Sequence, residues 1–193
     1  GAAHDAVVLS DGRIVLAGST DFYPSNHIGV ARLLSDGGLD LSFSGDGVWK
    51  SSIFEEGWGA AVQSDGAILV VGNSTGSTSR LRVTRLSDAG APDNTFGASG
   101  VFETLAGGSQ AFGRYVLVQP DGRIIYAWSG DAPDGRLNLA RALVNGSPDP
   151  SFSAGVATGT GRRGRAVQLE NVTDLLLTSW GEIVVAATGS FAD

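Results

Sequence analysis

The stretch "VVLSDGRIVLAG", residues 7–18, places an Asp-Gly pair between two short apolar runs. The same phrase returns three times, with the last copy divergent: "AVQSDGAILVVG" (61–72), "LVQPDGRIIYAW" (117–128) and "LLTSWGEIVVAA" (176–187). The turn aspartates of the first three copies stand 54 and 56 residues apart and are Asp11, Asp65 and Asp121. Self-similarity at a nearly fixed period is the sequence signature of a repeat architecture.

A second phrase follows each of the first three copies and carries an arginine, an aspartate and a phenylalanine. The aspartate follows the arginine by eight residues, and the phenylalanine follows the aspartate by three. The three sets are Arg32, Asp40 and Phe43; Arg85, Asp93 and Phe96; and Arg141, Asp149 and Phe152. A residue that every copy needs is more often structural than a ligand group. We expect each arginine to hydrogen-bond the turn after its own strand, and each phenylalanine to be a core anchor between repeats.

Each repeat unit reads as four short strands. The first two strands form a hairpin across Asp-Gly, which we expect to be a two-residue type I′ turn. The second strand is apolar on consecutive residues, as in "RIVLAG" (13–18), so both of its faces are expected to be buried. No segment has the 3.6-residue apolar period of a capped helix. The sequence therefore predicts an all-β fold.

Four antiparallel strands in each unit of about 55 residues are typical of the blades of a β-propeller. A stacked β-solenoid is the main competitor, but its coils are usually shorter. We expect about 3.5 blades in a single repeat domain, over residues 4–52, 58–105, 114–158 and, for the partial fourth blade, 171–193. Because so few blades cannot close a ring, we expect further blades or a homo-oligomer to complete it.

Together these motifs resemble the delta-60 repeat, a unit of bacterial surface and secreted proteins. The resemblance rests on "SDGRIVLAG" (10–18) and "VARLLSDGGLDLSFSGDGV" (30–48), and it covers nearly the whole chain. It implies a propeller-like fold, an extracellular or cell-surface setting in bacteria, and a place in larger adhesin-like proteins. It implies no defined enzymatic activity. Trp128 departs from the pattern where the first two copies have glycine, and Trp180 replaces the turn aspartate.

The composition argues against several classes of function. The formal net charge of −7 is unfavourable for a nucleic-acid partner, which requires a basic surface. The chain has no cysteine, so disulfides and thiolate metal sites are excluded. No apolar run approaches the roughly 20 residues of a membrane helix, so we expect no membrane insertion. The sequence has no methionine and no visible signal peptide, which suggests a processed product or an excised fragment.

Three motif matches carry little weight. "GNSTG" (72–76) fits the nucleophile elbow with Ser74 as nucleophile, but no helix follows it. "GTGRRG" (159–164) fits a dinucleotide-binding loop, but no βαβ unit surrounds it. Closely spaced aspartates, as in "SGDAPDG" (129–135), suit calcium, but they do not match the EF-hand spacing and their glycines are explained by turns. We therefore expect no cofactor and no resident metal, with calcium as the alternative.

Chain direction assigns the connections between strands to two rims of the propeller. The Asp-Gly turns and the turns that hold Asp40 and its equivalents share one rim, which we call the turn rim. The opposite rim, which we call the loop rim, carries the connections that differ between repeats. Because binding sites are common on variable loops held by a rigid scaffold, the candidate ligand-binding residues are placed there. They are Phe22, Tyr23, His27, Trp58, Phe112, Trp128, Arg162, Arg163 and Arg165.

Aromatic side chains on the loop rim suit sugar rings or protein partners, and a cluster of arginines suits an anionic glycan or a phosphate. The competing interpretation is that these side chains pack under loops and pair with neighbouring acids. We expect a non-catalytic recognition or adhesion module of an exported bacterial protein, with a cell-surface glycan or protein as partner. The alternatives are a lectin, with Trp58 and Trp128 stacking on sugars, and a structural spacer of a fibre. An enzyme comes last; a carboxylate clustered with histidine or tyrosine in a deep pocket would favour it.

Overall fold

Four antiparallel sheets follow one another along the chain in the computed structural model, which describes residues 1–20, 26–53, 55–74, 79–104, 111–130, 137–152, 159–160 and 166–191. The described strands are β1 (Ala2–Val8), β2 (Ile14–Ser19), β3 (Ile28–Leu33), β4 (Val48–Lys50), β5 (Glu55–Val62), β6 (Ile68–Ser74), β7 (Leu81–Leu86), β8 (Val101–Thr104), β9 (Ala111–Val118), β10 (Ile124–Gly130), β11 (Leu137–Ala142), β12 (Gly159–Thr160), β13 (Ala166–Leu177) and β14 (Ile183–Phe191). Within these ranges, no helix is long and apolar enough to cross a bilayer.

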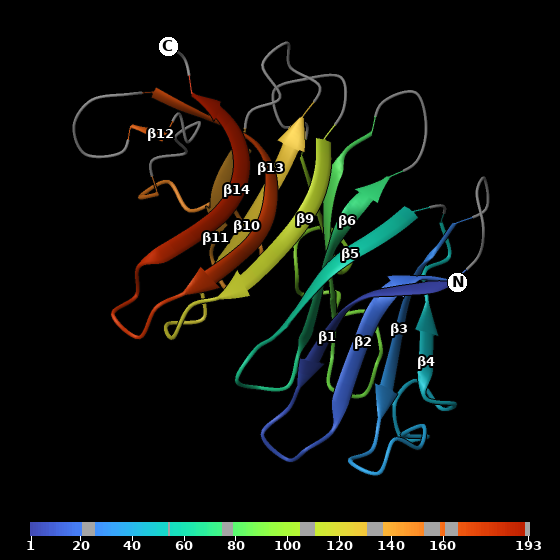
Figure 1. Cartoon of the computed structure of the whole chain (residues 1–193). Helices are drawn as coiled ribbons and strands as arrows, with labels where there is room; N and C mark the ends of the chain where they lie inside the picture. The colour runs from blue at the N-terminus through green and yellow to red at the C-terminus, as the bar shows by residue number, and fades with distance from the viewer. Residues whose placement is uncertain are drawn as a thin grey trace.

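The sheets have the strand orders β1-β2-β3-β4, β5-β6-β7-β8, β11-β10-β9 and β12-β13-β14, and they stand side by side like consecutive propeller blades (Figure 1). The innermost strands contact one another: β1 packs against β5, β5 against β9, and β9 against β13. The blades form an open arc, with the first and fourth sheets at its two ends. The prediction of an all-β, propeller-like fold is confirmed.

The limits of the blades differ slightly from those expected. The first sheet begins at Ala2, and β13 of the fourth sheet begins at Ala166 rather than near residue 171. The fourth strand expected for the third blade, over 154–158, lies outside the described residues.

The Asp-Gly turns differ from the expected type. In the first one, the Leu9 N–H donates to the Arg13 carbonyl at 2.8 Å, and the Gly12 N–H donates to the Leu9 carbonyl at 3.0 Å. Gly12 has a φ of 86°, whereas Asp11 is not among the residues of positive φ. The loop is a three-residue type I turn closed by a left-handed glycine, so the two-residue type I′ expectation is wrong. The Asp11 carboxylate instead accepts the Arg13 N–H at 3.0 Å.

The divergent fourth turn keeps this geometry without its aspartate. The Thr178 N–H donates to the Glu182 carbonyl at 2.9 Å, and the Gly181 N–H donates to the Thr178 carbonyl at 3.0 Å. Gly181 has a φ of 81°. Trp180, in the position of the aspartate, is 86% exposed. The turn therefore requires its glycine more strictly than its acid.

The arginine and the aspartate of the second phrase meet in all three copies. Arg32 donates to Asp40 at 2.7 Å through Nε. The equivalent ion pairs measure 2.8 Å each and are Arg85–Asp93 and Arg141–Asp149. The Ser42 hydroxyl, which donates to Asp40 at 2.6 Å, lowers the pKa of that carboxyl, and Arg32 lowers it further. Each pair closes the turn that follows the third strand of its own blade.

The first two of these arginines also bond to the next blade, a contact that the sequence did not predict. Arg32 donates through Nη1 to the carbonyl of Asp88 in the second blade. Arg85 donates in the same way to the carbonyl of Val144 in the third blade, at 2.7 Å. The guanidinium of Arg32 also lies over the ring of Phe43, 4.9 Å from its centroid. One buried cation therefore joins its own turn, its own aromatic ring and the neighbouring blade.

The phenylalanines fill the interfaces between blades. Phe43 is fully buried, in a cluster that joins Val30 of the first blade to Ile68 of the second. Phe96 has the same place between the second and third blades, and Phe152 packs, partly buried, against the cluster between the third and fourth. The blades are thus joined by a repeated set of Arg and Phe contacts, which we call the Arg–Phe lock.

Candidate functional site

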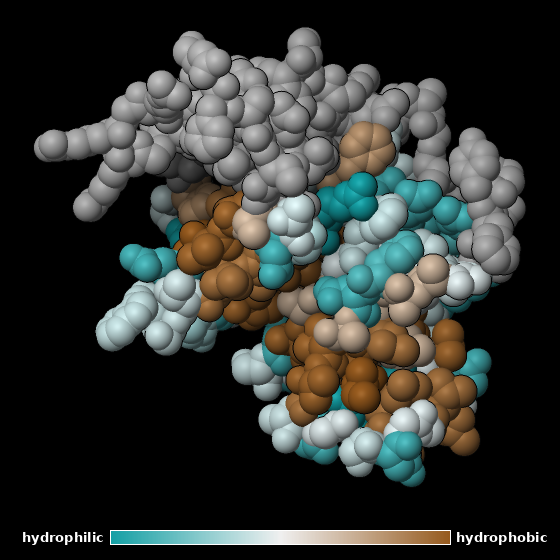
Figure 2. Space-filling view, viewed as in Figure 1, coloured by the Kyte–Doolittle hydropathy of each residue, from teal (hydrophilic) through white to brown (hydrophobic). Residues whose placement is uncertain are grey.

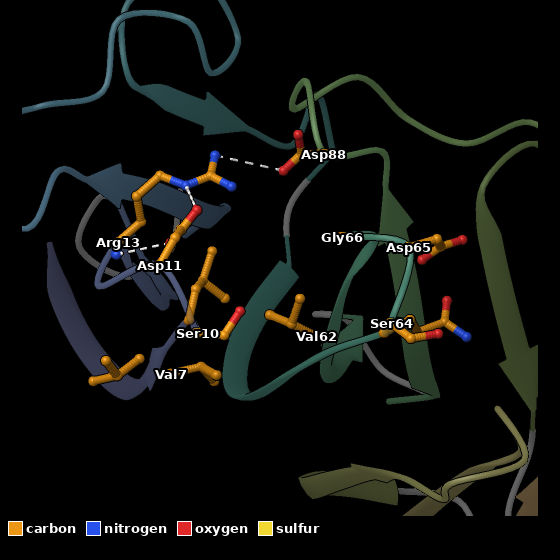
Figure 3. A pocket seen from close by; sticks show the side chains of 12 residues that line it. Val7, Ser10, Asp11, Arg13, Val62, Ser64, Asp65, Gly66 and Asp88 are labelled. Atoms are coloured by element: carbon orange, nitrogen blue, oxygen red, sulfur yellow. Dashed lines mark hydrogen bonds and ion pairs between the residues drawn. The ribbon is translucent and has the colours of Figure 1, made fainter.

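A cavity of about 470 Å³ lies on the turn rim, between the Asp-Gly turns of the first two blades (Figure 3). Arg13 extends across it from Asp11, which it contacts at 2.7 Å, toward Asp88, 3.7 Å away, while Asp65 points away from it. The Arg13 backbone N–H, bonded to the Asp11 carboxylate, lowers the pKa of Asp11. Arg13 also lies 3.7 Å from Asp40, so both kinds of turn share this rim. Because these charges satisfy one another within the repeated turns, we assign this cavity to the scaffold.

A second cavity, of about 620 Å³, is lined by the inner strands β1, β5, β9 and β13. We call the space along these inner strands of the open arc the central channel. Each of these strands has a β-bulge seven residues before the Asp or Trp of its following turn. One residue in each bulge has no cross-strand partner: His4, Trp58, Arg114 and Thr173. Bulges re-aim a side chain and are frequent beside functional sites. The four bulges therefore present four different side chains at one equivalent position of the repeat.

Two of the bulge residues, His4 and Arg114, contact a third, Trp58. The imidazole of His4 stacks on the indole of Trp58, with ring centroids 4.4 Å apart and planes inclined by 15°. The guanidinium of Arg114 lies over the same indole, 4.1 Å from its centroid. Trp58 Nε1 donates to Asn73 at 3.0 Å, and His4 Nδ1 lies 2.7 Å from the Gly57 carbonyl. Since β5 lies between β1 and β9, the indole is held from both neighbouring strands.

Two carboxylates and a phenol face the same cavity, from Asp5, Asp174 and Tyr115. Both oxygens of Asp5 accept backbone N–H groups at 2.8 Å, one of them from Ala60 in the next blade. Asp174 accepts the N–H of Leu175 at 2.8 Å through Oδ1 only, among the described residues. Asp5 therefore joins two blades, whereas Asp174 keeps one carboxylate oxygen for the cavity.

Burial and the neighbouring charges together shift the pKa of Tyr115. Burial raises the pKa of the Tyr115 phenol, and the Asp174 carboxylate raises it further, against the opposing effect of Arg114. The phenol is therefore protonated at neutral pH and can donate a hydrogen bond to a ligand. Within the described part of the chain, Arg114 makes no ion pair. The cavity thus combines a guanidinium donor, a carboxylate acceptor and a phenol that can do both.

The structure relocates two aromatic residues that the sequence placed on the loop rim. Trp58 is half-buried on β5 in the channel. Trp128 lies on β10, is 8% exposed and stacks on Tyr126 with centroids 5.8 Å apart, in the core between the second and third blades. The loop-rim position expected for Trp128 is therefore wrong. Residue 128 is still inside the pleated strand, so its side chain follows Ile124 and Tyr126 onto the same buried face.

The other candidate residues are not gathered into one site by the described structure. Phe112 is half-buried on β9, and His27 lies before β3, with Nδ1 2.8 Å from the Ser51 carbonyl. Phe22, Tyr23, Arg162, Arg163 and Arg165 lie outside the described residues. In the part of the chain that the structure describes, no group of three or more His, Asp or Glu side chains is arranged to hold a metal ion.

A family model described as a domain of unknown function (DUF5122) beta-propeller matches residues 9–43, 63–96 and 119–152, more than half of the chain. The chain belongs to this family. Each segment that matches the DUF5122 model begins just before an Asp-Gly turn and ends at the phenylalanine of the Arg–Phe lock. The resemblance stated from the sequence is thereby confirmed as far as a β-propeller repeat family.

A solved streptogramin B lyase structure is similar to this DUF5122 chain, with a TM-score of 0.44 and 16% sequence identity. The alignment covers 94% of this chain and 53% of that one, so the chain spans about half the length of the structure it matches. No curated protein matches the sequence.

The channel residues lie outside all three segments that match the DUF5122 model. His4 precedes the first segment, Trp58 the second and Arg114 the third. The family pattern therefore describes the scaffold, and the channel is where this member differs from repeat to repeat. Sequence reasoning missed His4, Arg114, Tyr115 and Asp174. The bulge position could have been found by aligning the repeats on their turns. The residue seven places before the Asp or Trp of each turn differs in every repeat and is His, Trp, Arg or Thr.

Proposed function

We propose that the chain is a non-catalytic recognition module of an exported bacterial protein, and that it binds a cell-surface glycan in the central channel. One observation carries the proposal: four equivalent bulges carry four different side chains, and three of these, His4, Trp58 and Arg114, line one cavity. A scaffold residue is repeated in every blade, as the Arg–Phe lock is. A position that is structurally repeated but chemically varied is typical of a binding surface.

The chemistry of the cavity favours a polyhydroxylated ligand. Each sugar hydroxyl both donates and accepts hydrogen bonds, so it requires fixed donors and acceptors close together. Arg114 supplies donors, and the Tyr115 phenol supplies a donor or an acceptor. Asp174 supplies an acceptor through Oδ2, which accepts no hydrogen bond from a described residue. The stacking of His4 and Arg114 on Trp58 orders the site before a ligand arrives, which reduces the entropic cost of binding.

The structure changes how a lectin function would operate in this chain. The sequence suggested that Trp58 and Trp128 stack on sugars, but Trp128 is buried and Trp58 is contacted by His4 and Arg114. A sugar that stacked on Trp58 would have to displace one of these partners. Polar recognition by Arg114 and Asp174 therefore replaces aromatic stacking in the proposal.

The exported, surface-associated setting and the adhesive role rest on the delta-60 resemblance, and the DUF5122 match is consistent with a β-propeller module of this kind. The bulges lie toward the loop-rim ends of the inner strands, away from the turns. A ligand that enters the channel from the loop rim would therefore meet the variable connections first. The channel and the loop rim together would form one binding surface.

A glycan array probed with the whole chain tests the proposal. We expect binding to at least one class of bacterial or host surface glycan, and a loss of about tenfold or more for Arg114→Gln, which removes a charged hydrogen-bond donor. Arg123→Gln is the matched control, since Arg123 belongs to the turn rim and pairs with Asp121. Absence of binding to every glycan class, or equal loss in both variants, would contradict the proposal and leave a structural spacer.

A second candidate, an acid–base enzyme, is favoured by one specific observation. The channel gathers His4, Tyr115 and Asp174, the residue types that a general acid and a general base require. Against this, the His4 ring is stacked and its Nδ1 is held at the Gly57 carbonyl. Mass spectrometry of a bound glycan after prolonged incubation separates the two: the recognition proposal predicts unchanged glycan, and cleavage or unsaturation would show an enzyme.

A further inference from the structure

Both fully described blade interfaces use the same aromatic contact. The Phe43 ring of the first blade lies against Gly90 of the second, and the Phe96 ring lies against Gly146 of the third. A Cβ added to Gly90 would lie 2.9 Å from the Phe43 ring, and one added to Gly146 would lie 2.7 Å from the Phe96 ring. Both glycines have positive φ, of 81° and 83°. Each interface therefore requires glycine for its turn and for the ring packed on it.

The polar contacts of these two interfaces are equivalent as well. The carbonyl two residues before each glycine accepts a hydrogen bond from the arginine of the preceding blade. The carbonyl one residue before each glycine accepts a backbone N–H of the preceding blade, at 2.8 and 3.0 Å. These acceptors are Asp88 and Ala89 in the second blade, and Val144 and Asn145 in the third.

The first blade has the same receiving turn with nothing packed on it. Its equivalent glycine, Gly37, has a φ of 88°, and an added Cβ would meet no atom within 4 Å. The equivalent carbonyls belong to Ser35 and Asp36, and neither accepts a hydrogen bond from a described residue. The turn at Gly37 therefore has the same backbone conformation as the turns at Gly90 and Gly146, which contact a neighbouring blade. No contact within the first blade requires this conformation.

The apolar strand beside this turn, β2, is more exposed than its equivalent β6 in the second blade. Ile68 and Val70 of β6 are 1% and 0% exposed because the first blade covers them. Their equivalents in β2, Ile14 and Leu16, are partly exposed, and Val8 of β1 is 70% exposed. The expectation that the second strand is buried on both faces thus fails in this blade, because no described blade packs against this face, and it fails in β14 as well, where Val184 is 43% exposed.

Apolar side chains form a continuous face over the first blade. Figure 2 shows them gathered over β1, β2 and β3. A shallow hollow of about 170 Å³ is lined there by Leu16, Ala31 and Val48. A contiguous apolar face of this kind marks an interaction surface.

We propose that this face of the first blade docks a further blade of the same repeat, one that carries arginine and phenylalanine eleven residues apart. The spacing is the one shared by the locks at Arg32 and Phe43 and at Arg85 and Phe96. The incoming phenylalanine seats on Gly37, and the incoming guanidinium donates to the carbonyl of Ser35. The interface is head-to-tail, as between the blades of this chain, and such interfaces close rings when the rotation allows it.

The test adds a blade to the complete chain. A second copy of residues 55–110 is fused directly ahead of Gly1, which reproduces the spacing of 56 residues between Trp58 and Arg114. Hydrogen exchange is then followed by mass spectrometry in peptides that cover β2, whose sequence occurs once in the fusion. We expect amide exchange in these peptides to slow by about tenfold or more relative to the 193-residue chain.

Two variants of the fusion make the test specific. Arg85→Met with Phe96→Ala, in the added copy only, removes the lock and is expected to restore the exchange rate of the unextended chain. Because that copy can fail to fold for its own reasons, Gly37→Ala is the second variant, which leaves the added blade intact and places a Cβ where the phenylalanine ring would sit. It is expected to have the same effect.

Unchanged exchange in the original fusion, or protection that survives Gly37→Ala, would overturn the proposal. Protection of β2 in the unextended chain that rises with protein concentration would show a second copy on this face. That result would also overturn the proposal, since it would need no added Arg–Phe pair.

Discussion

Replacing Gly90 with alanine tests the contact on which the packing of the blades depends. Gly90 has a φ of 81°, and a Cβ there would lie 2.8 Å from the Ser44 backbone nitrogen and 2.9 Å from the Phe43 ring. The left-handed backbone costs an alanine about 1 kcal/mol. Crowding a packed interface adds about 1–3 kcal/mol. We therefore expect Gly90→Ala to lower the free energy of unfolding by about 2–4 kcal/mol.

Gly37→Ala is the matched control for this substitution. Gly37 has a φ of 88°, but a Cβ would meet nothing within 4 Å, so only the backbone cost of about 1 kcal/mol remains. Urea unfolding is followed by tryptophan fluorescence, to which Trp49 contributes from its place beside the core of the first interface. Equal destabilisation by the two variants would refute the reasoning, because it would show that the Phe43 contact contributes nothing beyond the turn.

The remaining predictions concern the lock and its carboxylates. Arg32→Met removes the closer of the two cations beside Asp40, since Arg13 stays 3.7 Å away, and it should lower the free energy of unfolding in urea titrations by about 1.5–3 kcal/mol. Arg80→Met, at an exposed pair, should cost less than about 1 kcal/mol, and a reversed order would contradict the assignment. The Ser151 hydroxyl, followed by Arg141, lowers the pKa of Asp149 to about 2 from the usual 3.8. A lowered folded-state pKa gives stability that is complete above about pH 4 and is lost as the pH falls toward 2, so Asp149→Asn should flatten the fall of the urea midpoint over that range.

The fold could be predicted from the sequence because its determinants are local and repeated. The Asp-Gly pairs mark three equivalent hairpins, and the fixed spacing from Arg32 to Phe43 identifies one turn in each of three blades. The turn type was mispredicted, because a lone Asp-Gly pair does not reveal whether the preceding residue belongs to the loop. The second acceptor of Arg32, at Asp88, lies 56 residues away and depends on how the blades pack.

The candidate site was less predictable, for two physical reasons. A β-bulge shifts the register of a strand by one residue. The alternation of inward and outward side chains along the sequence therefore does not predict that Trp58 or Arg114 faces the channel. Trp128 shows the reverse error, since an aromatic residue near a strand end was assigned to the rim although the strand continues through it. Alignment of the repeats on their turns, with attention to the position that varies, would have corrected the first error.

The most direct test of the binding account is an NMR titration of the whole chain with the glycan selected on the array, observed at the indole N–H groups. The Trp58 N–H is bonded to Asn73 inside the channel, whereas Trp180 is exposed on the turn rim. We expect a saturable shift of the Trp58 signal, with the Trp180 signal unchanged. A shift confined to Trp180, or no change at Trp58 under saturating glycan, would contradict a binding site in the channel.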